Sequence, residues 1–178
     1  MFGYNIFLIG FMGTGKSTIA SCFAEKSAME IIEMDEAIAE KEGMSIPDIF
    51  AQHGEEYFRN LETAYLKEIE GMTRKIISCG GGAVLREENV SVMKESGRIV
   101  LLTASSKVIF ERVKNDNGRP LLKGRKSVEA IEGLVEARRA KYEDAADIII
   151  HIDGKSKEVI CEEIVNKLQR MKEGKENV

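Results

Sequence analysis

The sequence predicts an α/β fold in three layers, in which helices cover both faces of a five-stranded parallel sheet. Apolar runs of strand length alternate with amphipathic helical stretches along the whole chain. No internal repeat or low-complexity segment interrupts this alternation. The strands are expected at residues 4–9, 30–34, 75–79, 98–103 and 147–152.

Length and composition indicate one domain with a sizeable core. The chain has 178 residues, of which 43% are hydrophobic and 31% charged, as in ordinary globular proteins. The net charge of -4 argues against a general nucleic-acid-binding protein. Any anion that binds must therefore be held by cations placed locally at its site.

The cysteines and the apolar segments indicate the compartment. Cys22, Cys79 and Cys161 are odd in number and far apart, so they predict neither a disulfide framework nor a zinc site. The apolar N-terminus has no basic residue before Lys16, and no segment reaches the roughly 20 apolar residues of a membrane span. We expect a cytoplasmic, monomeric protein without a membrane or nucleic-acid partner.

The first strand runs into a phosphate-binding loop. Residues 10–17 follow the pattern G-x-x-x-x-G-K-S, and a helix is expected at 17–26 behind them. Glycines let backbone N–H groups converge on an anion, Lys16 can reach the outer phosphates, and the Ser17 hydroxyl can ligate Mg²⁺. Strand, loop and helix together predict the P-loop NTPase fold.

The second strand ends in acidic residues. Glu33 and Asp35 stand at its carboxyl end, where open α/β sheets place their ligands. A helix is expected at 36–42, and Ser45 with Asp48 three residues later is typical of the start of another. This helical insert separates the second strand from the third.

A longer helix is expected at 55–71, after a break at Gly54. Arg59 and Glu62 lie three residues apart on a face other than its apolar one. Helix periodicity alone favours a solvated ion pair for these two residues over a role in a ligand site.

The third strand breaks into three consecutive glycines, Gly80, Gly81 and Gly82. Such a run places bare backbone beside a group that needs close approach, or else forms a flexible loop. Many phosphate-loop enzymes carry an Asp at this strand end, which is absent here. The second protein partner of the metal is therefore expected from Glu33 or Asp35.

The stretch 115–125 differs in character from the rest of the chain. It follows a helix expected at 106–114, is rich in turn-forming residues and carries three cations. A mobile flap over a phosphate site has this composition, and so does an ordinary basic surface loop.

The C-terminal third supplies two further helices around the last strand. Ser127 is expected to cap a helix that continues through Tyr142, and a closing helix is expected at 157–170. Arg138 and Arg139 are adjacent on the first of these helices and so point in different directions. Only one of them is therefore expected to face a ligand.

Other classes of phosphate-loop protein fit the sequence less well. A GTPase would need an N-K-x-D guanine motif, and the nearest string, at 166–169, lacks the Asp. A transporter-type ATPase would be larger and carry a separate signature stretch. Small size, an acidic strand end, a helical insert and a basic flap instead favour a kinase of the nucleoside-monophosphate-kinase type that acts on a small acceptor.

Several further motifs occur in a characteristic order. They are the phosphate loop, the Asp35 segment, Gly43-Met44-Ser45-Ile46-Pro47-Asp48-Ile49-Phe50, Phe58-Arg59 with Glu62, Ser78-Cys79-Gly80-Gly81-Gly82, Arg119-Pro120-Leu121-Leu122, and Arg138 with Tyr142. In these motifs, over nearly its whole length, the chain resembles shikimate kinases. The phosphate loop is shared by many ATPases, whereas the F-R-x-x-E, G-G-G, R-P-L and R-x-x-x-Y stretches in this order are much more specific.

The resemblance implies ATP-dependent phosphorylation of the shikimate 3-hydroxyl, a step toward chorismate and the aromatic amino acids. Asp35 would act as the base, while Lys16, Mg²⁺ and Arg119 would stabilise the transferring phosphate. A substrate-binding insert would span residues 33–62 and a mobile lid residues 112–125.

The implied contacts divide between two ligands and a metal. ATP would contact Gly13, Thr14, Gly15, Lys16, Ser17, Thr18, Arg112, Arg119 and Lys155. Shikimate would contact Asp35, Arg59, Gly80, Gly81, Gly82 and Arg138. Mg²⁺ would be held by Ser17 and by Glu33, which stands where the family usually has an Asp.

Two rival functions remain open. A gluconate kinase would share the loop and the lid, but its acceptor would not obviously need Arg59, Arg138 and the glycine run together. A regulatory module that binds nucleotide without transferring phosphate would be expected to lack the base or the lid arginine. Both Asp35 and Arg119 are present in this chain.

Overall fold

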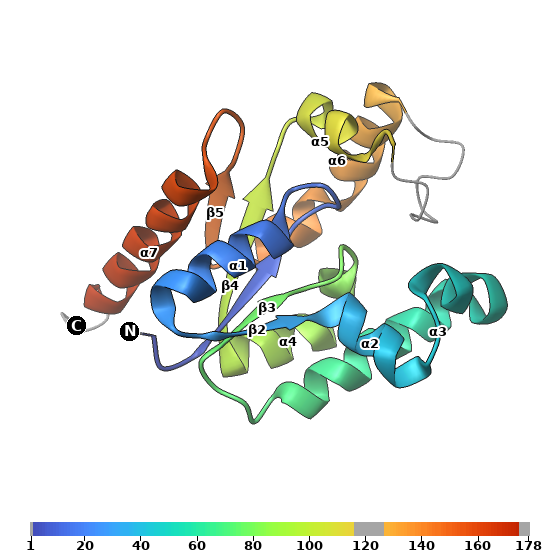
Figure 1. Cartoon of the computed structure of the whole chain (residues 1–178), viewed down its shortest axis with the longest axis horizontal. Coiled ribbons are helices and arrows are strands. Elements are labelled where there is room, and N and C mark those ends of the chain that lie inside the picture. Colours follow the sequence, from blue (N-terminus) through green and yellow to red (C-terminus); the bar gives the residue numbers. More distant parts are fainter. Residues whose placement is uncertain (1, 116–126, 175–178) are drawn as a thin grey trace.

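The five predicted strands form one parallel sheet in the order β2-β3-β1-β4-β5 (Figure 1). The computed structural model describes residues 2–115 and 127–174. Each strand boundary lies within one residue of its prediction. The strands are β1 (Asn5–Ile9), β2 (Glu30–Glu33), β3 (Lys75–Ser78), β4 (Gly97–Thr103) and β5 (Ile148–His151).

Helices cover both faces of this sheet, which confirms the predicted three layers (Figure 1). On one face lie α1 (Lys16–Ser27) and α7 (Lys157–Glu173). The other face carries α3 (Ile46–Ile69), α4 (Glu87–Ser96) and α6 (Val128–Ala145). The remaining helices are α2 (Met34–Glu42), α5 (Ser106–Val113) and the short 3₁₀ helix η1 (Ala83–Leu85).

Strand β1 lies at the centre of the sheet and is buried along its whole length. Ile6 and Leu8 belong to the core between the sheet and α1 and α7, while Phe7 and Ile9 belong to the core beneath α3 and α4. Successive side chains point to opposite faces, so a strand covered on both sides is apolar except where a buried polar side chain finds partners, as Asn5 does with the backbone of Met72 and Lys75. This explains the continuous apolar run that leads into the phosphate loop.

Helix α3 is interrupted at Gly54, whose φ of 83° and ψ of 174° are not helical. The break predicted at this glycine is therefore confirmed, and the Ser45 side chain caps the helix by accepting a hydrogen bond from Asp48 N. Asp48 lies in the first turn, as predicted. Even this longest helix is amphipathic, and no helix in the described ranges is both long and apolar enough to cross a membrane.

Two local predictions differ from the structure. Asp35 does not end strand β2 but lies in the first turn of α2, because that helix begins at Met34 rather than at residue 36. An acidic side chain in a first helical turn is favoured by the helix dipole. The glycine run continues into η1, which no periodic pattern of its three residues could predict.

Candidate active site

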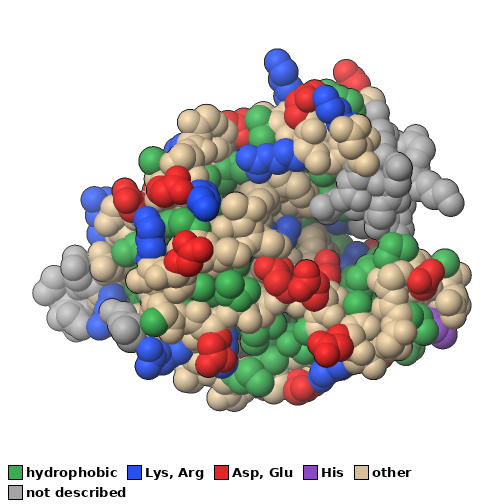
Figure 2. Space-filling view, viewed as in Figure 1, with side chains coloured by type: hydrophobic (Ala, Val, Ile, Leu, Met, Phe, Trp, Pro, Cys, Tyr) green, Lys and Arg blue, Asp and Glu red, His purple; other side chains and the backbone are tan. Residues whose placement is uncertain are grey.

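A cavity of about 650 Å³ opens at the carboxyl edge of the sheet. Figure 2 shows the molecule hollowed between the surface over α5 and α6 and the surface over α2 and α3, with acidic side chains along the edge of the hollow. Its lining brings together most of the predicted nucleotide and metal contacts. They are Gly13, Thr14, Gly15, Lys16, Ser17, Thr18, Glu33, Arg112 and Lys155. Two predicted acceptor contacts, Asp35 and Gly81, also line the cavity.

Glycine conformations and the contacts of Lys16 determine the shape of the phosphate loop. Gly13 and Gly15 have φ of 80° and 85°, which only glycine adopts without strain. Lys16 Nζ donates to the carbonyl oxygens of Gly10 at 2.9 Å and of Phe11 at 3.3 Å, so its ammonium lies across the loop. This arrangement leaves the loop N–H groups and one positive charge to receive an anion at the start of α1.

Three oxygen atoms meet beside the phosphate loop. Ser17 Oγ donates to Glu33 Oε2 at 2.9 Å and lies 3.4 Å from Ser78 Oγ. Mg²⁺ prefers oxygen ligands and is commonly bound by one or two carboxylates together with substrate phosphates. The described residues contain no group of three or more acidic, His or Cys side chains that could hold a metal ion. Glu33, rather than Asp35, contacts Ser17 here.

Ser78 was not among the predicted site residues. Strand pairing places it opposite Glu33, since these two residues are partners in the β2–β3 register. A serine at the end of an apolar strand does not by itself predict a role in a ligand site. Only the pairing of β2 with β3 brings its hydroxyl to the metal side of the cavity.

The solvated ion pair predicted for Arg59 and Glu62 is wrong. Arg59 is 6% exposed and Glu62 is fully buried, with Arg59 Nη1 donating to Glu62 Oε2 at 2.6 Å. Arg59 also donates from Nε and Nη2 to Glu55 Oε1, at 3.2 and 2.7 Å. A guanidinium taken out of water needs such partners, because an uncompensated buried charge is very costly.

Gly80 lies between two carboxylates. A Cβ at this position would lie 2.5 Å from Glu62 Oε1 and 2.6 Å from Asp35 Oδ1, so no other residue fits without displacing them. Glu62 Oε1 has no hydrogen-bond partner among the described residues. Burial raises the pKa of Glu62 from 4.5 to about 7, the Arg59 guanidinium opposes that rise, and the negative charge of Asp35 adds to it.

The raised pKa of Glu62 predicts a pH-dependent stability. Below pH 4.5 Glu62 is protonated in both the folded and the unfolded chain, and between pH 4.5 and about 7 only the folded chain keeps the proton. The contribution of Glu62 to the free energy of unfolding therefore falls as pH rises through this window, by roughly 3 kcal/mol. Urea unfolding at several pH values should show a flatter profile for Glu62→Gln. Glu56→Gln, whose carboxylate is exposed, should keep the wild-type slope, and an equal slope in all three proteins would contradict the prediction.

The other two glycines contact arginines of the site. A Cβ on Gly82 would lie 2.1 Å from Arg59 Nη1, and the Gly81 carbonyl accepts hydrogen bonds from Arg138 Nη1 at 3.4 Å and from the Tyr142 hydroxyl. The glycine run therefore forms a packed wall rather than a flexible loop. Arg139, by contrast, pairs with Glu136 at 2.7 Å with more than half of its side chain exposed. The prediction that the two adjacent arginines diverge is confirmed.

The remaining predicted contacts lie near the mouth of the cavity. Arg112 Nη1 donates to the carbonyl oxygen of Gly13 at 3.0 Å, and Lys155 pairs with Glu163 at 2.5 Å. Arg119 lies outside the described residues, as does most of the predicted lid. Of the predicted acceptor contacts, Asp35 and Gly81 line this cavity, whereas Arg59, Gly80, Gly82 and Arg138 are not among its lining residues.

Comparison with known families decides among the kinases considered from the sequence. Residues 12–169 match the shikimate kinase family. The chain belongs to the shikimate kinase family. It is therefore a kinase, with ATP as the co-substrate that such an enzyme requires. Among curated family members, that of Sulfurihydrogenibium sp. is 43% identical over 93% of this chain and 98% of its own length, and that of Thermodesulfovibrio yellowstonii is 41% identical over 96% and 98%.

Solved shikimate kinases share this fold. The enzyme from Acinetobacter baumannii, solved in complex with shikimate, superposes with a TM-score of 0.90 at 30% identity, over 95% of this chain and 94% of that one. The enzyme from Aquifex aeolicus gives 0.80 at 38% identity, over 93% and 96%. A gluconokinase from Sinorhizobium meliloti gives 0.59 at 17% identity over 97% and 95%, which shows a common fold and nothing about the acceptor.

Proposed function

We propose that this chain transfers the γ-phosphoryl group of ATP to the 3-hydroxyl of shikimate, a step toward chorismate and the aromatic amino acids. The observation that carries the proposal is the buried Arg59–Glu62 pair packed against the glycine wall, with Asp35 beside Gly80 on the cavity lined by the phosphate loop. A carboxylate-bearing ring with several hydroxyls needs both a guanidinium and a carboxylate in one pocket. The regulatory alternative explains this combination less well, whereas the gluconate kinase, whose acceptor also carries a carboxylate, is disfavoured by the family match.

On the nucleotide side, the backbone N–H groups of the loop and Lys16 hold the phosphates. Arg112 and Lys155 border the adenine. Ser17 and Glu33 hold Mg²⁺, which supplies positive charge against the phosphates when it is bound. Lys16 keeps a second positive charge in a fixed position, and Arg119 is proposed to add a third from the lid.

On the acceptor side, Arg59 and Arg138 hold the shikimate carboxylate with planar two-point contacts. The glycine wall lets the ring approach the backbone closely. Asp35 accepts a hydrogen bond from the reacting hydroxyl and takes its proton as the phosphoryl group arrives. Its position in the first turn of α2, on the cavity wall, supports this role.

A coupled assay of ADP release tests the proposal directly. Shikimate, gluconate and simple hydroxy acids are compared at equal concentration with ATP and Mg²⁺. We expect ADP release that depends on shikimate and is far slower with the other acceptors. Release no faster with shikimate than with buffer would refute the proposed function, and faster release with gluconate would favour the gluconate kinase.

Glu33→Gln tests the metal site. The substitution removes the carboxylate charge beside Ser17, so we expect the Mg²⁺ concentration for half-maximal rate to rise roughly tenfold. Glu36→Gln removes the same charge from the cavity wall and leaves the hydrogen bond from Ser17 to Glu33 intact, so its Mg²⁺ dependence should match the wild type. An unchanged Mg²⁺ requirement in Glu33→Gln would remove Glu33 from the site.

We also propose that the whole chain acts as one domain, with residues 33–62 as the acceptor-binding insert and residues 112–125 as a mobile lid. The position of α2 and α3 between β2 and β3 supports the insert. The monomeric state and the cytoplasmic location expected from the sequence stay predictions.

A further inference from the structure

All three guanidinium nitrogens of Arg59 already donate to carboxylates of the protein. Nε and Nη2 share Glu55 Oε1, and Nη1 donates to Glu62 Oε2. The edge formed by Nε and Nη2 is one that a ligand carboxylate uses for two-point recognition. Glu55 therefore stands where an acceptor carboxylate would bind.

The two carboxylates on Arg59 differ in how easily they can leave. Glu62 is fully buried, so moving away from Arg59 would leave a charge without a partner in a low-dielectric interior. The Glu55 side chain is 48% exposed and belongs to an i,i+4 pair on the same helix. Water can take over the hydrogen bonds of the Glu55 carboxylate, so this half-exposed pair costs less to break than the buried pair with Glu62. Glu55 is thus the carboxylate that an incoming anion can displace.

Arg59 keeps its position when Glu55 leaves. Glu62 still holds Nη1, the guanidinium packs against Gly82, and its Cζ lies 5.5 Å from the centre of the Phe58 ring. The Nε and Nη2 donors are then available to a ligand while the Arg59 side chain keeps its rotamer. Loss of the Glu55 contact therefore exposes a preorganised site rather than a disordered arginine.

We propose that Glu55 sets the acceptor affinity and specificity of this site, as an internal carboxylate that occupies Arg59 and must be displaced by the carboxylate of the acceptor. The inference rests on the proposed role of Arg59 in binding shikimate. An acceptor that carries a carboxylate displaces Glu55 and supplies Arg59 with new hydrogen bonds in place of those it loses. An acceptor without a carboxylate cannot displace Glu55. The Glu55 side chain then still covers the Nε and Nη2 edge of Arg59 and obstructs that acceptor. Glu55 thus lowers affinity for every acceptor but penalises uncharged ones more.

Calorimetric titration of shikimate into the full-length protein tests the proposal. We expect Glu55→Gln to lower the Kd for shikimate by about two- to fivefold, the range expected from losing competition with an exposed ion pair. Glu55→Asp keeps the charge but shortens the reach to Arg59, so its Kd should lie between those of wild type and Glu55→Gln. Thermal unfolding checks that each variant is folded, which is expected because Glu55 is half exposed.

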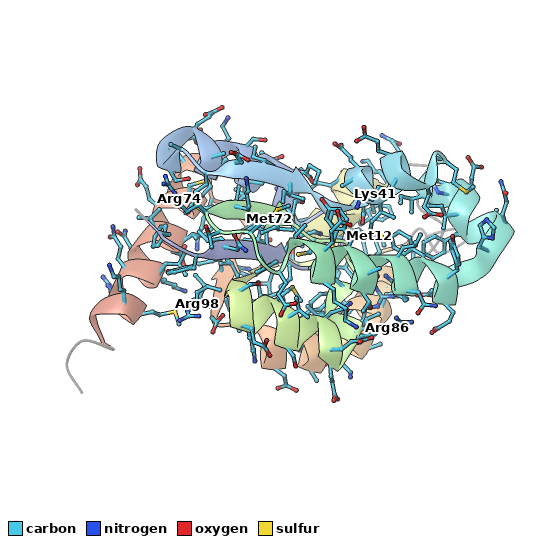
Figure 3. The ribbon with its side chains drawn as sticks, turned by 90° about the horizontal axis from the view of Figure 1, so that it is seen from below. Met12, Lys41, Met72, Arg74, Arg86 and Arg98 are labelled. Carbon is cyan, nitrogen blue, oxygen red and sulfur yellow. The ribbon has the colours of Figure 1, made fainter. Side chains whose placement is uncertain are left out.

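Glu56→Gln is the matched control. Glu56 is the next residue on the same helix, but its side chain is 84% exposed and pairs with Arg86, which lies beside α3 in Figure 3. The substitution removes one carboxylate charge at the neighbouring position and leaves the Arg59 pairs with Glu55 and Glu62 in place. Its Kd for shikimate should equal that of the wild type.

The outcomes separate this inference from the proposed function. If wild type binds and phosphorylates shikimate but Glu55→Gln binds it equally or more weakly, Glu55 orients Arg59 and the inference is overturned. Equal tightening in Glu55→Gln and Glu56→Gln would reveal a general charge effect and overturn it as well. A wild type that neither binds nor phosphorylates shikimate would overturn the proposed function, and the role of Glu55 with it.

Discussion

Replacing Gly82 with alanine is expected to raise the KM for shikimate about 100-fold, the cost of displacing one partner of a buried charge pair, while the KM for ATP changes little. The new Cβ would lie 2.1, 2.3 and 2.5 Å from Nη1, Cζ and Nη2 of Arg59. Contacts this short cannot exist, so the guanidinium must move. The φ of Gly82 is -117°, which alanine adopts freely, so the effect comes from the collision alone.

Steady-state kinetics in both substrates measure this effect. Gly133→Ala on α6 is a suitable control, because a Cβ there meets no atom within 4 Å. Its KM values should match the wild type. A KM for shikimate that stays within a few-fold of wild type in Gly82→Ala would mean that Arg59 relaxes without loss of binding, and would weaken its proposed role.

The phosphate loop and the strands around it were predictable because their causes are local. The loop pattern places glycines at residues 10 and 15, and both have φ above zero, at 142° and 85°. The central strands β1 and β4 are mostly apolar because helices cover the sheet there on both faces. The spacing of residues in the sequence therefore predicts the phosphate-loop part of the site, including the positions of Lys16 and Ser17 on the cavity wall.

The burial of Arg59 and Glu62 was not predictable from spacing. An i,i+3 pair looks the same in sequence whether water or protein surrounds it. Here the glycine wall covers one side of the pair, so its burial depends on the segment that follows β3, about twenty residues further along the chain. A usable signal was nevertheless present in the three glycines, because a position that excludes even a Cβ implies a large side chain packed against it.

The position of Asp35 shows a related limit. Strand β2 and helix α2 adjoin without a loop, so the acidic pair Glu33 and Asp35 spans the junction between them. Sequence placed both residues at the strand end, yet only Glu33 contacts Ser17, whereas Asp35 lies beside Gly80. The start of α2 at Met34 separates Glu33, which contacts Ser17, from Asp35, which lies near Gly80.

Replacing Lys16 with methionine is expected to lower kcat about 1,000-fold, the upper range for losing one fixed group that stabilises transition-state charge. Methionine keeps much of the length of the side chain and removes its charge. Lys16 Nζ is positioned by the carbonyl oxygens of Gly10 and Phe11, so in the wild type its charge is already oriented before the phosphoryl group moves. Orientation fixed in advance is what makes such a charge effective.

Single-turnover kinetics with saturating ATP and shikimate separate this loss from weaker binding. Lys26→Met is the matched control, because Lys26 lies near the other end of α1, with its side chain 43% exposed and paired with Glu162 at 3.7 Å. Its kcat should equal that of the wild type. If Lys16→Met kept kcat within tenfold, the charge that stabilises transfer would have to come from other cations. Arg112, which donates to Gly13 at the cavity mouth, would then be the first to test by the same substitution.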